Sequence, residues 1–158
     1  MCGIVAVTGY RQSLPLLVEG LEKLEYRGYD SAGISIIDSD NKKLICHKAE
    51  GKLKNLKHKL DKKIISGSLG IGHTRWATHG KPVLRNAHPH CDSTKQVAVV
   101  QNGIIENYLE LKTKLESEGI IFTSETDTEV IPHLVQKELR NLSTVSYTHL
   151  TLPTTSAV

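Results

Sequence analysis

The chain has 158 residues, with 20 Lys and Arg against 17 Asp and Glu, and a formal net charge of +3. This length accommodates one domain with a sizeable core. A composition of 39% hydrophobic and 23% charged residues excludes a disordered chain, and no apolar run approaches the ~20 residues of a transmembrane helix. So small a net charge does not indicate a nucleic-acid partner. Three unevenly spaced cysteines and the lack of a signal-peptide pattern predict a reduced, cytoplasmic protein.

The first half of the chain alternates apolar strands with amphipathic helices. In chain order, the patterns predict a buried strand at 4–7, a helix capped by Ser13 and ending near Tyr26, a turn at 28–30, strands at 32–37 and 43–48, and a helix at 52–63. Leucines at helical spacing give each helix an apolar face: Leu14, Leu17, Leu21 and Leu24, then Leu53, Leu56 and Leu60. Strand, helix and hairpin in this order favour a largely antiparallel sheet with helices on one face.

The lysines between residues 52 and 63 have two interpretations. They are the solvated outer face of a surface helix, or they bind an anionic partner such as a nucleic acid. No aromatic residue alternates with these lysines to stack on bases. The surface helix is therefore the favoured interpretation.

The second half predicts further strands and helices around polar loops. In chain order, these are a strand at 71–74, a long polar loop at 81–94, a strand at 97–100, a helix capped by Asn107 with Glu110 and ended by Gly119, a brief strand at 120–122, and a helix that Asp127 caps and that continues through Leu139. Pro132 costs the last helix one early hydrogen bond.

Residues 141–158 differ in composition from the rest of the chain. They contain no Lys, Arg, Asp or Glu and are dominated by Ser and Thr. We interpret this tail as appended non-native sequence or, alternatively, as a native disordered segment. The predicted domain therefore covers residues 1–140.

Cys2 is a candidate nucleophile. If Met1 is removed, Cys2 carries a thiol with a pKa of roughly 8.5 beside a free α-amine with a pKa of roughly 7.7 to 8.0, so nucleophile and base share one residue. Gly3 leaves the backbone open beside the sulfur. The alternative is an ordinary buried cysteine next to the first strand.

Four other residues would complete the chemistry of amide hydrolysis. Asn102 and the Gly103 N–H could donate to the oxyanion that thiol attack on a carboxamide creates. Arg75 could bind an α-carboxylate, and Asp127 could accept from an α-ammonium group. The loop 74–80 could close over the ligand, with Gly80 as hinge. Each residue also has an ordinary structural explanation, as a turn, a surface cation or a helix cap.

A metal site is a further alternative. It would draw on five residues with metal-binding side chains: His73, His79, His88, His90 and Cys91. The run His-Pro-His-Cys is not a zinc-binding spacing, so the sequence predicts no metal.

Several motifs in this order resemble a known family. They are MCGIV at 1–5, EYRGYDSAG at 25–33, HTRWATHG at 73–80, NAHPH at 86–90, NGIIEN at 102–107 and SETDTEVI at 124–131. The chain resembles the glutaminase domain of the isomerizing glutamine:fructose-6-phosphate amidotransferases, the glucosamine-6-phosphate synthases, among the class II, N-terminal-nucleophile glutamine amidotransferases. Amidophosphoribosyltransferases share the opening Cys-Gly-Ile, but the longer motifs favour the sugar-phosphate enzymes.

The resemblance implies an α+β fold, an αββα sandwich of antiparallel sheets, and it implies roles for individual residues. Cys2 would be the nucleophile, and Asn102 with Gly103 would form the oxyanion hole. Arg75 and Asp127 would bind the charged groups of glutamine. The closing loop would contain Trp76, Thr78 and His79, and Arg27 and His88 would support the site from behind. No cofactor is implied. Ammonia released from glutamine would pass to an isomerase domain that acts on fructose 6-phosphate, in a homo-oligomeric full-length protein.

Two departures from the family pattern matter. Gln101 stands where that pattern has a histidine, which puts the hydrogen bonding behind the site in doubt. The resemblance also stops before the sandwich is complete, and no isomerase domain follows. An incomplete sandwich would leave exposed strand edges and apolar faces, so we expect poor stability and aggregation. A fragment without enzymatic activity is the alternative.

Overall fold

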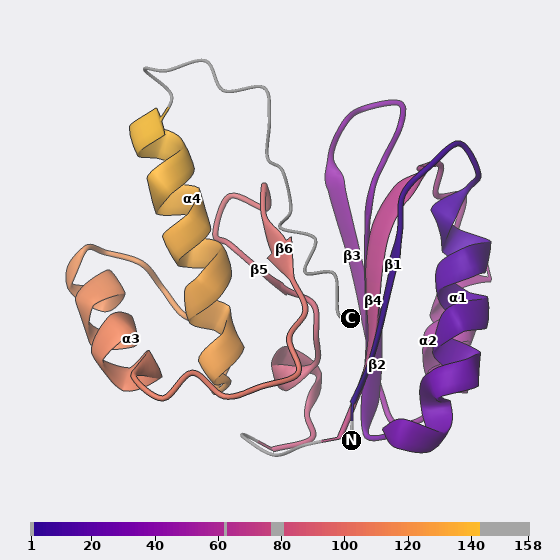
Figure 1. The fold of residues 1–158 in the computed structure, drawn as a ribbon, viewed down its shortest axis with the longest axis horizontal. Coiled ribbons are helices and arrows are strands. Elements are labelled where there is room, and N and C mark those ends of the chain that lie inside the picture. The colour runs from indigo at the N-terminus through magenta and orange to yellow at the C-terminus, as the bar shows by residue number, and fades with distance from the viewer. Residues whose placement is uncertain (1, 62, 77–80, 143–158) are drawn as a thin grey trace, which may run out of the picture.

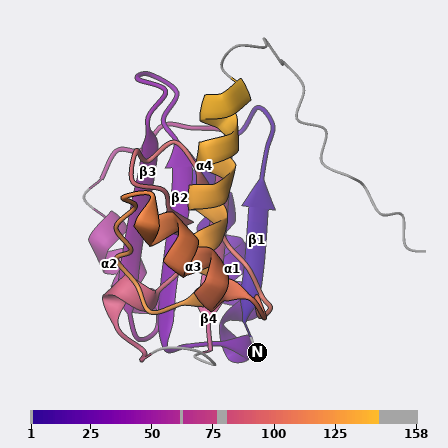
Figure 2. The same ribbon diagram turned by 90° about the vertical axis from the view of Figure 1, so that its left-hand side faces the viewer.

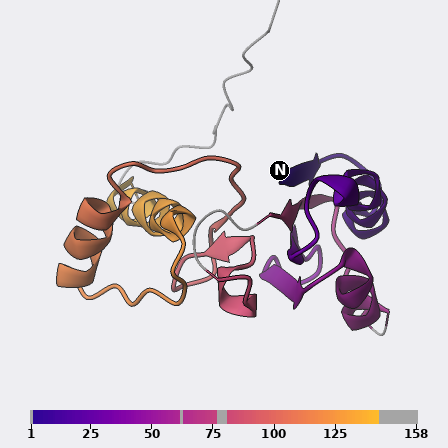
Figure 3. The same ribbon diagram turned by 90° about the horizontal axis from the view of Figure 1, so that it is seen from below.

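Two antiparallel sheets of unequal size face each other between two pairs of helices (Figure 1). The structure is a computed structural model that describes residues 2–61, 63–76 and 81–142. The larger sheet has the order β1 (Gly3–Val7), β4 (Leu69–Arg75), β2 (Ser31–Ile37) and β3 (Leu44–Glu50), and the smaller pairs β5 (His90–Cys91) with β6 (Ala98–Val99). The layers follow as helix, sheet, sheet and helix, which Figure 3 shows from below.

The predicted leucine faces form the core on the outer side of the larger sheet. Helices α1 (Ser13–Leu24) and α2 (Leu53–Leu60) bury Leu17, Leu21, Leu53 and Leu56 at 0–1% exposure. In the same cluster lie Ile34 and Ile36 of β2. Because side chains alternate along a strand, the intervening residues of β2 face the second layer, and β2 is buried on both faces.

Pairing between β1 and β4 sets the position of the chain's start. The two strands run antiparallel with Gly3 opposite Thr74. Cys2 therefore lies at the end of β4 where Arg75 and Trp76 leave the sheet.

Helices α3 (Tyr108–Ser117) and α4 (Val130–Leu142) form the layer beyond the smaller sheet (Figure 2). Helix α4 contacts both β5 and β6. Short 3-10 turns connect the elements: η1 (Glu25–Arg27), η2 (Leu84–Asn86) and η3 (Asp127–Glu129).

None of the three predicted caps makes a capping hydrogen bond with its side chain, and two of the side chains bond to distant groups instead. Ser13 is the first residue of α1, and its hydroxyl donates to the carbonyl of Gly67 (2.8 Å). Asn107 precedes α3 but makes no capping hydrogen bond with its side chain. Asp127 begins η3, and its carboxylate accepts the backbone N–H of Ile105 (2.8 Å).

Strand predictions in the second half were partly wrong. The predicted strand at 97–100 is reduced to Ala98–Val99, and residues 120–122 form no strand. Both segments lie at the smaller sheet or beyond it, where few neighbouring strands supply backbone partners. The helix α4 continues to Leu142, and residues 143–158 of the predicted tail lie outside the described residues.

An apolar cleft of ≈ 740 Å³ of empty volume lies between the larger sheet and the second layer. Its lining includes Ile37 and Leu69 from the sheet and Val135 and Leu139 from α4. These four side chains are 38–46% exposed. The expected tendency to aggregate stays a prediction. Among the described residues, no helix is long and apolar enough to cross a membrane.

Gly33 allows the two layers to approach. A Cβ atom at this position of β2 would lie 2.1 Å from the carbonyl oxygen of His88. Since real Cβ atoms do not approach a backbone oxygen so closely, any larger residue would push the segment that precedes β5 off the sheet.

We expect Gly33→Ala to lower the free energy of unfolding by about 1 to 3 kcal/mol, because the clash is with backbone. Gly72→Ala in β4 is the matched control, since its Cβ would meet side-chain carbons of Leu21 and Ile34 at 3.0–3.4 Å, which can move. Urea unfolding curves measure both. Equal stability losses in the two variants would contradict this account of Gly33.

Candidate active site

Most of the predicted site residues line one cavity of ≈ 330 Å³ of empty volume. It lies at the end of β4, where the two sheets and η3 meet. Its lining consists of Cys2, Arg75, Trp76, His88, Gln101, Asn102, Gly103, Thr126, Asp127 and Thr128. The structure therefore brings together residues separated by more than a hundred positions in the sequence.

The Cys2 thiol lies against the main chain of Trp76. The Trp76 N–H donates to Cys2 Sγ (3.2 Å), and Sγ lies 3.5 Å from the Trp76 carbonyl oxygen, to which it can donate. The half-exposed indole packs edge-on against the Tyr29 ring, with 5.3 Å between centroids. Two of the sequence motifs thus meet beside the sulfur.

Asn102 connects the first residues of the chain to β4. Its Nδ2 donates to the carbonyl oxygen of Cys2 (3.2 Å), and its Oδ1 lies 2.8 Å from Nε2 of His73. His73 is 1% exposed, and burial lowers its pKa to about 4. At neutral pH its imidazole is uncharged.

Opposite charges line the cavity at Arg75 and Asp127, which are 4% and 5% exposed. Arg75 Nη1 lies 4.0 Å from Asp30 Oδ1 and donates to the carbonyl of Lys81 (3.3 Å). Asp127 accepts the Ile105 N–H on one carboxylate oxygen. A zwitterionic ligand would find one partner for each of its charges.

Three buried histidines extend from the cavity between the layers. His73 stacks on His88 (4.3 Å between centroids), and His88 meets His90 edge-on (4.7 Å). Burial lowers the pKa of His90 to about 3, and burial with repulsion from His73 and His90 lowers the pKa of His88 still further. All three imidazoles are neutral at neutral pH.

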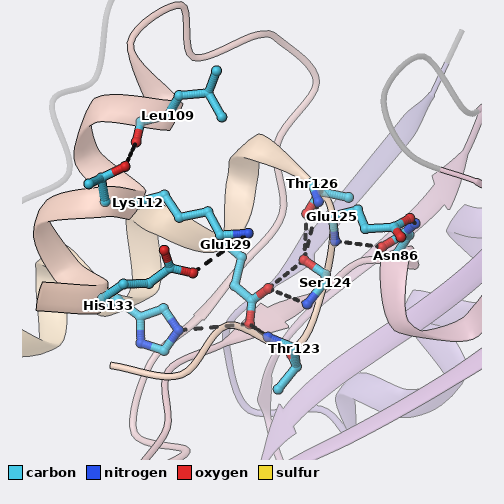
Figure 4. A network of polar contacts seen from close by, with 11 residues as sticks. Asn86, Leu109, Lys112, Thr123, Ser124, Glu125, Thr126, Glu129 and His133 are labelled. Atoms are coloured by element: carbon cyan, nitrogen blue, oxygen red, sulfur yellow. Dashed lines mark hydrogen bonds and ion pairs between the residues drawn. The ribbon is translucent and has the colours of Figure 1, made fainter. Parts of the chain in front are cut away.

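A buried carboxylate holds the loop that leads to Asp127 (Figure 4). Glu129 Oε1 accepts from the backbone N–H and the hydroxyl of Thr123 (2.8 and 2.7 Å), and Oε2 accepts from the same two groups of Ser124. Burial alone would raise the Glu129 pKa, but the nearby His133 imidazole (3.8 Å) and the hydrogen bonds from Ser124 and Thr123 lower it far below its ordinary value. The loop is fixed at the cavity edge by a charged acceptor.

Gln101 does make hydrogen bonds at the position where the sequence raised doubt. Its Oε1 accepts from the Thr128 hydroxyl (3.1 Å), and its backbone N–H points at His88 Nδ1 (3.4 Å). Gln101 thereby connects the asparagine turn to η3.

Several expected residues lie outside the cavity lining, and one residue beside the site was missed. Arg27 is not among the cavity-lining residues, and its guanidinium lies over the Tyr26 ring (5.9 Å); its supporting role stays a prediction. Thr78 and His79 lie outside the described residues. His73 was considered only as a metal ligand, although its spacing of two from Arg75 in a strand places both on one face. Within the described ranges, no three or more His, Cys, Asp or Glu side chains are arranged so that they could hold a metal ion.

Comparison with known proteins decides the family. A family model described as "Glutamine amidotransferase domain" matches residues 73–147. Over 146 residues the chain is 56% identical to glutamine--fructose-6-phosphate aminotransferase [isomerizing] of Thermosynechococcus vestitus, and over 136 residues it is 59% identical to the protein of that name in Gloeobacter violaceus. The chain belongs to the glutamine amidotransferase domain family.

The matches cover 92% and 85% of this glutamine amidotransferase domain but only 23% and 22% of the two relatives. Among solved structures, an allosteric regulatory enzyme of purine biosynthesis superposes with a TM-score of 0.73 at 28% identity, over 96% of this chain and 30% of that one. Glutamine phosphoribosylpyrophosphate amidotransferase of B. subtilis gives 0.70 at 29%, with the same coverage. These neighbours confirm the predicted N-terminal-nucleophile fold.

We expect the buried histidines to make the domain acid-labile. In the unfolded chain each has a pKa of about 6.5, above its folded value, so the unfolded state binds more protons once the pH falls below about 6.5. Each neutral histidine then costs up to about 1.4 kcal/mol of stability per pH unit, until the pH reaches its folded pKa. Urea unfolding between pH 7 and 5 measures the slope.

His58→Asn is the control for loss of a histidine outside the core, because the His58 side chain is 69% exposed. A free energy of unfolding that does not change from pH 7 to 5 would contradict burial of neutral histidines. Carboxylates such as Glu129 lose their contribution only below about pH 4.3, outside this window.

Proposed function

We propose that this domain hydrolyses the side-chain amide of glutamine through a thioester on Cys2. The observation that carries the proposal is the single cavity that holds a thiol, an amide donor, a buried cation and a buried anion. The family to which the chain belongs is consistent with glutamine as the substrate.

The charged residues would select an amino acid. The Arg75 guanidinium would bind the α-carboxylate, and the Asp127 carboxylate would accept from the α-ammonium group. Trp76 would cover the ligand together with Thr78 and His79, the last two of which lie outside the described residues. Fixing both ends of the ligand leaves its side-chain amide as the group that reaches Cys2.

The reaction then needs two steps at one carbon. In the first step the Cys2 sulfur forms a bond to the amide carbon, and the amide oxygen becomes an oxyanion that accepts hydrogen bonds from Asn102 Nδ2 and the Gly103 N–H. The C–N bond then breaks as the nitrogen takes a proton and leaves as ammonia. Water attacks the thioester, which releases glutamate and restores the thiol. Once Met1 is removed, the α-amine of Cys2 would accept the thiol proton and return it to the leaving nitrogen.

The ammonia has a second use in the longer protein that the relatives indicate. We propose that it is transferred to fructose 6-phosphate, giving glucosamine 6-phosphate, by a part of the parent that lies beyond this chain, in a cytoplasmic homo-oligomer. Identities of 56–59% to the sugar-phosphate enzymes, against 28–29% to the purine enzymes, favour this acceptor over phosphoribosylpyrophosphate.

Treatment with a diazoketone analogue of glutamine, followed by peptide mass spectrometry, tests the nucleophile. We expect label on Cys2 and none on Cys46 or Cys91, with protection by glutamine and not by asparagine, whose amide is one methylene short. A cooperative thermal melt by circular dichroism must accompany the result. An unlabelled Cys2 in a folded sample that lacks Met1 would refute the proposal, and a sample without a cooperative melt would identify a non-enzymatic fragment.

A further inference from the structure

We infer that His73 is a positioning residue that sets the orientation of the Asn102 side-chain amide, and so aims its N–H donor at the reacting carbonyl. The inference rests on the proposed glutamine hydrolysis for its catalytic consequence. Its structural part, the hydrogen bond between the two side chains, stands on geometry alone.

The orientation follows from what each partner can donate or accept. The carbonyl oxygen of Cys2 can only accept, so the Asn102 atom that faces it at 3.2 Å must be Nδ2. The other amide atom, Oδ1, then faces His73 Nε2 at 2.8 Å. Because Oδ1 can only accept, Nε2 must carry a hydrogen.

The tautomer of His73 therefore acts together with the Cys2 carbonyl to hold the amide in this orientation. With the proton on Nδ1, Nε2 would be an acceptor facing Oδ1, and the amide would have to turn over. Oδ1 would then face both the Cys2 carbonyl and the position of the developing oxyanion, where a negative atom is repelled. The Nε2–H form keeps the donor on the thiol side.

His73 is rigidly held, as a positioning residue must be. It lies in β4 opposite Ile4 of β1 and Gly33 of β2, so both neighbouring strands fix its backbone. Its ring is 1% exposed and stacks on His88. Nδ1 has no hydrogen-bond partner among the described residues, so the hydrogen bond to Asn102 is the polar contact of this ring that the geometry shows.

The consequence for catalysis is a loss in the chemical step. Removal of one oxyanion donor costs about 10²–10³-fold in kcat. Loss of the contact that orients this donor should cost less, about 10–100-fold. Binding of the ligand's charged groups by Arg75 and Asp127 is separate, so KM should change little.

Glutaminase kinetics of His73→Leu and His73→Gln in the full chain provide the first test. Leucine fills the space without a donor, whereas the Nε2 amide of glutamine can replace the imidazole N–H. We expect kcat to fall about 10–100-fold in His73→Leu at nearly constant KM, with most of the loss recovered in His73→Gln. His58→Leu, on the exposed face of α2, should match the wild type. Unchanged kcat in folded His73→Leu would overturn the inference.

Nitrogen-15 NMR of the wild-type chain provides a second test that needs no activity. We expect the His73 ring to show the Nε2–H tautomer. The hydrogen on Nε2 should exchange slowly with water, because it is buried and hydrogen-bonded to Asn102. Observation of the Nδ1–H tautomer would overturn the inference even if the enzyme is active. If the chain shows the Nε2–H tautomer but neither hydrolyses glutamine nor is labelled at Cys2, the proposed function is refuted and the hydrogen bond between His73 and Asn102 still stands.

Discussion

Strand β4 is the element on which the site depends, because it lies between β1 and β2 in the larger sheet. Because β4 pairs with β1, the first residues of the chain lie beside the end of β4. Arg75 is the last residue of β4, and the main chain of the next residue, Trp76, contacts the Cys2 sulfur. His73 and Arg75, two residues apart, face the second layer. One central strand thus fixes the proposed nucleophile, the cation that we propose binds the substrate, and the histidine that contacts Asn102.

The contact between layers is unusual for a protein interior, because polar groups rather than hydrocarbon fill it near the site. Three neutral imidazoles pack together, two stacked and one edge-on, beside the point where Gly33 gives room to the His88 backbone, and a hydrogen-bonded Glu129 anchors the loop to Asp127. Burial keeps the histidines uncharged and so able to act as donors and acceptors of fixed direction. The same burial makes their protonation costly and ties stability to pH.

The sequence allowed prediction of much of the larger sheet, because its strands and the leucine faces of α1 and α2 follow simple periods. It did not allow prediction of the caps, since Ser13 and Asp127 bond to groups 54 and 22 residues away. The length of the strand at Ala98–Val99 was overestimated, because an apolar run in the sequence does not reveal how few neighbouring strands are available to pair with it. Of the site, the motifs indicated Cys2, Arg75, Asn102 and Asp127, but no local pattern identified the contact between His73 and Asn102.

The crystal structure of the chain after reaction with the diazoketone analogue of glutamine would test the central claim most directly. We expect the adduct on Cys2 Sγ with its carbonyl oxygen about 3 Å from both Asn102 Nδ2 and the Gly103 nitrogen, its carboxylate on Arg75 and its ammonium group on Asp127. An adduct whose carbonyl oxygen faces away from Asn102, or whose charged groups lie outside this cavity, would contradict the account.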